Sequence, residues 1–293
     1  MTRLSSSQFG LLLLLFGSMV DSTSGLFTRL LGTDGFTTAS GRGFMAFAFL
    51  ALLLVLRDGP GGLRRLVTLG VWGVAFVLLN AVGMVMNILS LANTSVANFF
   101  MIFATAPFVA ALAARVVLGE KLDLATLLAA LAGFAGIAIM MASGASAGGL
   151  IGDILAVGCL FCYSAIVLVI RKNPKMDILP VVAITVLTSG LLALPFASFS
   201  TASGRDWLLL ALFGAIQLGG GNLLIFSAVR RIPAAQAGLL GILNAGFAPA
   251  WVLLFLGEVP PTPTLIGGAI ILTAAVAHLI WTLTRPQAVA TGP

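Results

Sequence analysis

Ten long apolar runs follow one another along this chain, and they constrain its fold more than any other feature. A helix needs about 20 apolar residues to cross the hydrocarbon core of a bilayer. Glycine, proline and charged residues, which end helices, separate the runs. The runs cover residues 9–30, 36–56, 66–91, 95–118, 122–142, 150–171, 178–199, 206–229, 234–256 and 264–284. The sequence therefore predicts an all-α integral membrane protein with ten transmembrane helices.

Charged residues are too few for a water-soluble domain of this length. Of the 293 residues, 60% are hydrophobic and 8% are charged, and the mean hydropathy is +1.15. Soluble domains carry about 25% charged residues, because they must cover their surface in water. The net charge of +6 is divided into small groups between the apolar runs. This pattern argues against nucleic acid as a partner and for a lipid bilayer.

Lysine and arginine lie mostly on one side of the predicted helices. If the N-terminus is cytoplasmic, the cytoplasmic connections carry twelve of them and the outer ones carry three, namely Arg29, Arg42 and Arg205. Cytoplasmic loops are enriched in these residues. The bias predicts a multi-pass protein of a bacterial-type inner membrane with both termini in the cytoplasm. The first run is expected to remain as a helix, because no signal-cleavage site follows it.

The chain contains an internal duplication. The tripeptide Leu-Gly-Glu occurs at residues 118–120 and again at 256–258, an offset of 138 residues. A slightly larger offset pairs residues 9–30 with residues 151–172. The predicted repeats are residues 1–145 and 146–293, with five helices each. Because five is odd, the second repeat inserts upside down, and inverted repeats place a substrate site near the midplane and permit alternating access.

The residues at the ends of these helices resemble a known family. Pro107 and Phe108 precede the first Leu-Gly-Glu, the second copy ends the ninth helix, and Gly-Asp-Ile-Leu at 152–155 opens the sixth. This pattern resembles the EamA branch of the drug/metabolite transporter superfamily. Pro249 departs from it, preceding its glutamate by nine residues where Pro107 precedes its own by thirteen. The chain is most similar overall to bacterial aromatic amino acid exporters, which implies efflux of phenylalanine, tyrosine, tryptophan or similar compounds without nucleotide hydrolysis or a cofactor.

Asp21 is the only carboxylate near the middle of a predicted helix, and hydroxyl side chains surround it. Polar side chains in a membrane helix face the bundle interior or a water-filled cavity. Asp21 is therefore expected to contact a substrate ammonium group or to take part in proton coupling. Equally, it is expected to form an ion pair with Arg42 that joins the first two helices, because buried carboxylates usually have partners.

Further polar and aromatic residues are expected to line the same cavity, although single aromatics more often face lipid or neighbouring helices. Asn80 and Asn87 lie seven residues apart on one helix face, with Met84 between them. Tyr163 is the only tyrosine, and a buried hydroxyl needs a partner. The other candidates are Asn98, Phe99, Phe103, Gln217, Asn222, Gln236, Asn244 and Trp251.

Glycines and prolines mark candidate hinges. Three consecutive glycines lower helix stability, so they either allow local unwinding beside a cavity or form a seam for close helix packing. Glu120 and Glu258 stand at helix ends and are expected to cap turns. The candidate hinge or packing residues are Pro107, Gly219, Gly220, Gly221 and Pro249.

The predicted mid-membrane side chains indicate a substrate class. Nearly all basic residues lie at the cytoplasmic ends, whereas the midplane holds amides, hydroxyls, methionines and aromatics. This inventory suits a zwitterionic or neutral small molecule with an aromatic or apolar side chain. A single deep acid favours facilitated movement over proton coupling, which stays an alternative. A multidrug or other metabolite exporter of the same fold is a second alternative, and the sequence is compatible with a monomer.

The sequence argues against an enzyme. One histidine, His278, and one deep acid cannot assemble a zinc-hydrolase, paired-aspartate or Ser/His site. A Walker motif is also missing from the sequence, so neither a metal nor a nucleotide cofactor is expected. Cys159 and Cys162 lie inside an apolar run and are interpreted as small helix residues rather than a redox pair.

Overall fold

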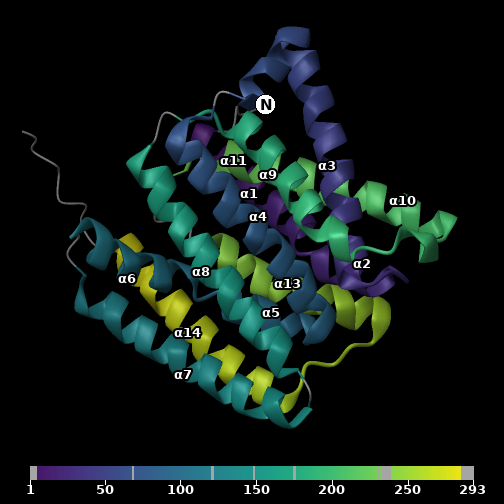
Figure 1. The fold of residues 1–293 in the computed structure, drawn as a ribbon. Helices are drawn as coiled ribbons and strands as arrows, with labels where there is room; N and C mark the ends of the chain where they lie inside the picture. Colours follow the sequence, from purple (N-terminus) through teal and green to yellow (C-terminus); the bar gives the residue numbers. More distant parts are fainter. Residues whose placement is uncertain are drawn as a thin grey trace, which may run out of the picture.

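A computed structural model describes residues 5–67, 69–119, 122–147, 149–173, 176–229, 231–232 and 239–284 of the chain (Figure 1). Every regular element in these ranges is a helix. As the sequence predicts, ten helical segments are long and apolar enough to cross a membrane. These spans are Ser6–Leu30, Gly35–Asp58, Gly70–Asn93, Val96–Leu118, Leu124–Ala142, Leu150–Ile170, Ile178–Phe196, Gly204–Ile225, Leu239–Leu256 and Thr262–Thr284.

Seven of these spans contain one α-helix each, within the part of the chain described. The Asp34 side chain caps the first of them by accepting hydrogen bonds from Phe36 N at 2.8 Å and Thr37 N at 3.0 Å. Gly59 ends that helix with a positive φ of 68°. The seven helices are α3 (Gly35–Asp58), α4 (Gly70–Asn93), α7 (Leu124–Ala147), α8 (Leu150–Lys172), α9 (Ile178–Ala193), α13 (Leu239–Leu256) and α14 (Thr262–Thr284).

The other three spans are interrupted. The first comprises α1 (Ser6–Asp21) and α2 (Ser24–Leu30), and the fourth comprises α5 (Val96–Phe103) and α6 (Ala106–Leu118). The eighth comprises α10 (Gly204–Leu212), the π-helix η4 (Phe213–Gly220) and α11 (Gly221–Val229). Short 3-10 helices lie between spans at η1 (Pro60–Val67) and η3 (Phe199–Thr201), and η2 (Leu194–Phe196) ends the seventh span.

Hydroxyl side chains and a proline account for the first two interruptions. At the α1–α2 break, Ser22 Oγ donates to Met19 O at 2.9 Å and Thr23 Oγ1 donates to Val20 O at 2.6 Å. At the α5–α6 break, Thr105 Oγ1 donates to Ile102 O at 2.7 Å, and Pro107 brings no N–H of its own. Pro107 thus lies at a break in its span, whereas Pro249 lies inside the continuous α13.

The pattern of contacts between helices stays the same if each helix is replaced by its counterpart in the other five-helix repeat. The most extensive contacts join α4 to α8, α7 to α14, α3 to α9 and α1 to α11. Exchange of the repeats turns the α4–α8 contact into the α1–α11 contact and leaves the α3–α9 and α7–α14 contacts as they are. Figure 1 shows α7 and α14 side by side along one edge of the bundle. With five spans per repeat, the second repeat runs in the inverted direction, as predicted.

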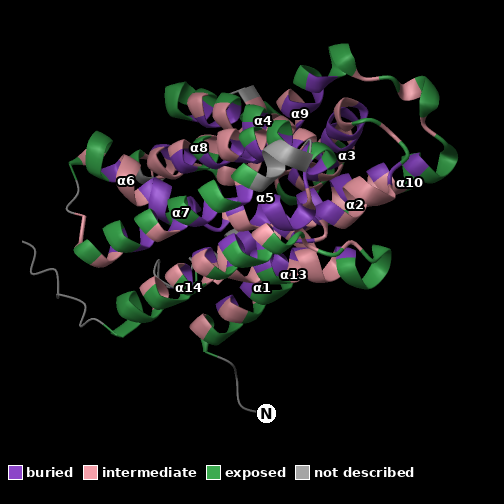
Figure 2. Ribbon diagram, turned by 90° about the horizontal axis from the view of Figure 1, so that it is seen from below, coloured by how far each residue is buried: buried purple, intermediate pink, exposed green. Residues whose placement is uncertain are grey.

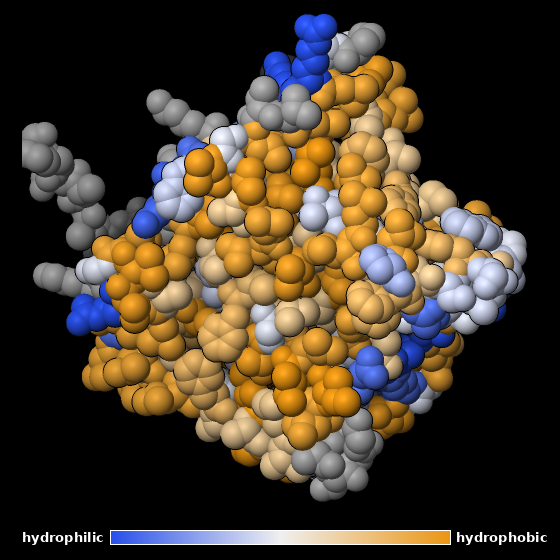
Figure 3. Space-filling view, in the orientation of Figure 1, coloured by the Kyte–Doolittle hydropathy of each residue, from blue (hydrophilic) through white to orange (hydrophobic). Residues whose placement is uncertain are grey.

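The outer surface of the bundle is apolar. Buried residues gather around the central helices and exposed residues face outward (Figure 2). Figure 3 shows a mostly hydrophobic face, with hydrophilic residues in separate groups near its margins. Large apolar side chains are openly exposed, such as Val71 at 83% and Leu254 at 74%. A surface of this kind is stable against lipid and unfavourable in water.

The two ends of the bundle carry different polar groups. We call the end where α2, α4 and α13 finish and α8 begins the Glu258 end, and the end where α3, α8 and α11 finish and α9 begins the Arg57 end. At the Arg57 end, Arg57 and Arg65 both lie near Asp58 and Asp177, with closest N–O distances of 2.7–3.6 Å. The cavity described below lies between these ends.

Candidate substrate cavity

A cavity of about 220 Å³ lies inside the bundle, walled by helices of both repeats. It is lined from α1, α2, α3, α4 and α5 of the first repeat and from α8, η4, α11 and α13 of the second. The structure brings together here ten of the residues that the sequence singles out. They are Asp21, Asn80, Met84, Asn87, Phe99, Phe103, Tyr163, Gln217, Asn222 and Asn244.

Asp21 lies at the end of α1, directly before the break in the first span. Asn244 Nδ2 donates to its Oδ2 at 2.8 Å, and Gln217 Nε2 donates to its Oδ1 at 3.2 Å. Gln217 also donates to the backbone carbonyl of Asp21 at 3.0 Å. Both amides come from the second repeat, so the carboxylate ties the two repeats together through neutral partners.

Arg42 lines the cavity, although the sequence predicts it only as an ion-pair partner of Asp21. It was counted among the outer residues, but α3 begins seven residues earlier, and the side chain is only 3% exposed inside the bundle. Its Nη2 donates to Met84 O at 3.1 Å and to Asn87 Oδ1 at 3.5 Å. The guanidinium lies over the Phe213 ring, 4.9 Å from the centroid. Its position inside the predicted span 36–56 was the sequence feature that could have indicated that it lies within the membrane.

Asp21 and Arg42 line the same cavity without forming an ion pair. Salt bridges within 4.0 Å join other residues in the described ranges, but not these two. The predicted ion pair between the first two spans is therefore wrong. The physical reason is that each group is held by its own partners, Asp21 by amides of η4 and α13 and Arg42 by groups on α4.

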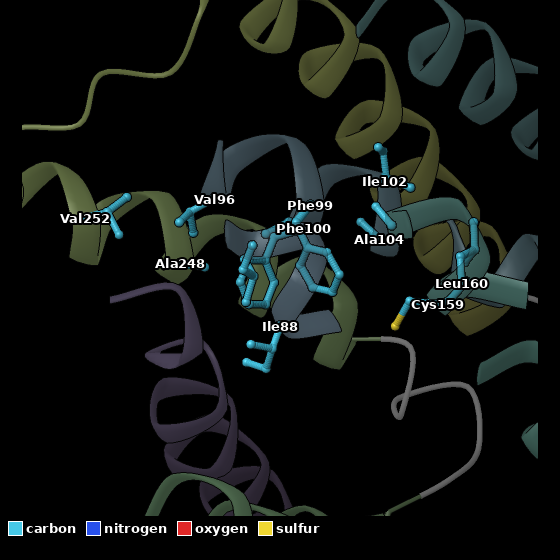
Figure 4. Close-up of a cluster of buried hydrophobic side chains, with 14 of the residues drawn as sticks. Ile88, Val96, Phe99, Phe100, Ile102, Ala104, Cys159, Leu160, Ala248 and Val252 are labelled. Carbon is cyan, nitrogen blue, oxygen red and sulfur yellow. The ribbon is translucent and has the colours of Figure 1, made fainter. Parts of the chain in front are cut away.

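Aromatic rings form one part of the cavity lining, which we call the aromatic wall. Phe99 and Phe103 of α5 stack with centroids 5.7 Å apart, and Phe103 lies 5.0 Å from Tyr163 of α8. Phe100 meets Phe99 edge to face at 5.1 Å, and both rings sit among buried apolar residues (Figure 4). The Tyr163 hydroxyl forms no hydrogen bond within the described part of the chain, so the partner expected for it is not a neighbouring side chain.

The internal duplication relates two lining residues of the cavity, Asp21 and Tyr163. Residues 9–30 correspond to 151–172, an offset of 142, and 21 plus 142 is 163. Asp21 and Tyr163 therefore hold equivalent positions in the two repeats, and both line the cavity. One repeat contributes a carboxylate at this position and the other an aromatic ring. The lining of the cavity therefore combines polar and aromatic groups.

Two predicted cavity residues, Asn98 and Trp251, are not part of its lining in the structure. Asn98 belongs to a buried network instead, in which its Nδ2 donates to Asp153 Oδ1 at 3.1 Å and its Oδ1 accepts from the Thr264 hydroxyl. Trp251 Nε1 donates to Ser22 Oγ at 3.0 Å, beside the break in the first span. Gln236 lies outside the described residues.

In the glycine run predicted as a hinge or packing seam, Gly219 and Gly220 end a π-helix and Gly221 begins α11. Gln217 and Leu218 of this π-helix line the cavity, whereas the three glycines are not among the lining residues. A side chain at Gly219 would place its Cβ 2.5 Å from the Phe49 ring of α3, whereas at Gly220 the nearest atom is 3.7 Å away. Close packing on α3 therefore explains Gly219. π-Helical turns are frequent at functional sites, which agrees with the position of this one.

Glu258 forms a bridge between helices at the Glu258 end. It accepts from Arg29 Nε at 2.9 Å and from the Val96 backbone N at 3.1 Å, so it caps α5 rather than its own helix. Arg29 also donates to the carbonyls of Leu91 at 2.6 Å and Thr94 at 2.8 Å. These bonds join α2, α4, α5 and the end of α13. Its counterpart in the first repeat, Glu120, lies outside the described residues.

A second hollow, of about 680 Å³, lies toward the Arg57 end. Charged residues of α3 and of the segments flanking α9 and α11 line it, including Arg57, Asp177 and Arg231. Asn222 lines both this hollow and the central cavity. The two spaces therefore adjoin at Asn222, while the Arg29–Glu258 bridge spans the opposite end.

Comparison with known proteins agrees with this architecture. The profile of the EamA-like transporter family matches twice, at residues 8–142 and 150–280. A search of curated proteins finds no match. Thirteen chains of solved structures match, and one of them, titled "Crystal structure of protein", superposes with a TM-score of 0.65 at 18% identity, covering 94% of this chain and 99% of that one. At this identity the likeness concerns the fold alone. The two family matches, one for each repeat, show that the chain is a membrane transporter protein belonging to the EamA-like transporter family.

Proposed function

We propose that this transporter exports small amphipathic solutes, with aromatic and hydrophobic amino acids as its main substrates. The observation that carries the proposal is the central cavity itself. Its lining combines charged and amide groups at Asp21, Gln217 and Asn244 with the rings of Phe99, Phe103 and Tyr163. An amino acid with an apolar side chain also combines a polar head with an apolar body.

The size of the cavity supports a small solute. At about 220 Å³ it is below the range of about 300–1,000 Å³ typical of sites for drug-sized ligands. Met84 adds an adaptable apolar surface beside the rings. A compact head with one ring or one branched chain suits this space better than a large multi-ring compound.

Alternating access is the transport mode we propose. The cavity lies between the repeats, adjoins the hollow at the Arg57 end through Asn222, and is separated from the other end by the Arg29–Glu258 bridge. With the cytoplasmic termini that the lysine and arginine distribution predicts, the Arg57 end faces the cytoplasm. Loading from the cytoplasm and release after the bridge opens then correspond to export.

Two alternatives are each favoured by one observation. The aromatic wall accepts apolar groups of many shapes, which suits a multidrug or general metabolite exporter. Asp21 places a carboxylate in the cavity, which suits proton coupling rather than facilitated movement. A toxicity panel of aromatic analogues and cationic dyes in expressing cells separates the first alternative. A pH gradient imposed across proteoliposomes separates the second.

The direct test is flux of labelled phenylalanine from proteoliposomes that contain the purified protein. We expect efflux well above that of protein-free liposomes, saturating with concentration and reduced by unlabelled tryptophan or leucine. Liposomes with Phe103→Asp, which places a charge in the aromatic wall, serve as the inactive comparison. Equal fluxes with and without the protein would refute the amino acid proposal.

A further inference from the structure

We infer that Arg42 binds the carboxylate of the transported solute and Asp21 its ammonium group, so that the cavity selects zwitterions over amphipathic cations. This inference rests on the proposed function, since it specifies how such a transporter chooses its solute. It also distinguishes between the amino acid and multidrug versions of that function.

Arg42 has no anion in direct contact, and Asp21 acts on it only electrostatically from across the cavity. Its side chain is buried, and only Nη2 takes part in hydrogen bonds with described residues, to one backbone carbonyl and one amide oxygen. No described carboxylate lies within 4.0 Å of it. A guanidinium carries five N–H donors in a planar fork. A buried charge without a counter-ion is costly, and a carboxylate ligand matches the fork with two parallel hydrogen bonds.

Asp21 likewise has no cation in direct contact, and Arg42 acts on it only electrostatically from across the cavity. Its two oxygens accept one hydrogen bond each, and both donors are neutral amides. A carboxylate offers about four lone pairs, so it keeps capacity for further donors. The residue stays partly exposed where it lines the cavity, unlike the amides that hold it. An ammonium group supplies both the missing positive charge and up to three N–H donors.

The two charges are kept apart by different parts of the fold. Asp21 is anchored to η4 and α13 of the second repeat, and Arg42 to α4 and to the ring of Phe213. A zwitterion placed between them compensates both charges at once. An amine without a carboxylate leaves Arg42 uncompensated, and a carboxylic acid without an amine leaves Asp21 uncompensated. This arrangement rejects each half-substrate through an unpaired buried charge.

The experiment compares three probes of one shape in proteoliposomes, namely phenylalanine, 2-phenylethylamine and 3-phenylpropionate. For Arg42→Gln we expect kcat/KM for phenylalanine to fall about tenfold to a hundredfold, the loss that follows removal of a charge-assisted pair. Flux of 2-phenylethylamine should stay unchanged or rise. Arg42→Lys keeps the charge without the fork and should lie between wild type and Arg42→Gln. Arg205→Gln, an exposed arginine distant from the cavity, is the matched control and should behave as wild type.

Competition in the wild-type protein gives a test without any variant. We expect unlabelled 2-phenylethylamine and 3-phenylpropionate to inhibit phenylalanine flux at least about tenfold less well than unlabelled tryptophan. Equal inhibition by the amine, or a parallel loss of phenylalanine and amine flux in folded Arg42→Gln protein, would overturn the inference.

Failure of the proposed function is distinguishable from failure of this inference. If none of the three probes is transported, the export proposal fails, and ligand-induced thermal stabilisation becomes the readout. A shift in the unfolding temperature by phenylalanine but not by 2-phenylethylamine, lost in Arg42→Gln, still supports the inference. Equal shifts with the two probes, or no shift with either, contradict it.

Discussion

The Arg29–Glu258 bridge allows a quantitative test of alternating access through the substitution Glu258→Gln. The wild-type carboxylate accepts from Arg29 Nε at 2.9 Å and from Val96 N at 3.1 Å. Glutamine keeps one acceptor oxygen and similar volume but loses the charge. The substitution therefore weakens the contact between α2, α5 and the end of α13 without creating a large cavity.

The expected magnitude follows from the geometry and the exposure. Hydrogen bonds to charged groups contribute about 1.5–3 kcal/mol when buried, whereas exposed ion pairs contribute about 0.2–1 kcal/mol. The Arg29 and Glu258 side chains are 27% and 24% exposed, which is intermediate. A loss of about 1–2 kcal/mol is therefore expected, and it changes an equilibrium by about fivefold to thirtyfold. The state that is open at the Glu258 end should become more populated by this factor.

Cysteine accessibility measures that population. Ser24 is 4% exposed and lines the cavity, so Ser24→Cys is the reporter in a background where Cys159 and Cys162 are replaced by alanine. A membrane-impermeant maleimide is applied from the Glu258 side. Glu258→Gln should raise the labelling rate about fivefold to thirtyfold, because labelling requires opening. Thr201→Cys, which is exposed in η3, should label at the same rate with either residue at 258.

An unchanged labelling rate at residue 24 in folded Glu258→Gln protein would refute the reasoning that this bridge holds the end closed. Arg29→Gln and the double variant complete a mutant cycle. If the two side chains act as a pair, the double variant should label no faster than the faster single variant.

Three further predictions concern residues that surround the cavity. Asn98→Leu should lower the free energy of unfolding by about 1–3 kcal/mol, because Asp153 loses a hydrogen bond in a buried network. Thermal unfolding in detergent measures this loss. The ratio of phenylalanine flux to 2-phenylethylamine flux should stay as in wild type. Gly219→Ala should destabilise by about 1–3 kcal/mol through overpacking against α3. The matched substitution Gly220→Ala should unfold near the wild-type temperature, and equal losses would contradict the packing argument. Trp251→Phe should cost about 0.5–1.5 kcal/mol through its lost bond to the hydroxyl at the α1–α2 break, with flux kept; a selective loss of transport would indicate that Trp251 contacts the solute.

Several features of the protein could be predicted because their physical causes are local. A span requires only a continuous apolar run of sufficient length, so the ten spans follow from the sequence. The duplication is visible as a repeated tripeptide at a fixed offset. Polar side chains in a membrane helix must face inward, and for this reason Asp21, Asn80 and Gln217 were recognised as cavity residues before their neighbours were known.

Other features depend on contacts between helices that are distant in the sequence. Helical periodicity indicates that Asn98 faces inward, but only the position of α8 decides that it meets Asp153 rather than the cavity. The depth of Arg42 in the bundle follows from where α3 starts and from its packing on α4. The pairing of Glu258 with Arg29 joins residues of different repeats. The sequence by itself determined the spans, their duplication and which polar residues turn inward, because these depend on local hydrophobicity. Only the tertiary structure decided which inward-facing groups meet, because their partners are set by how the helices pack together.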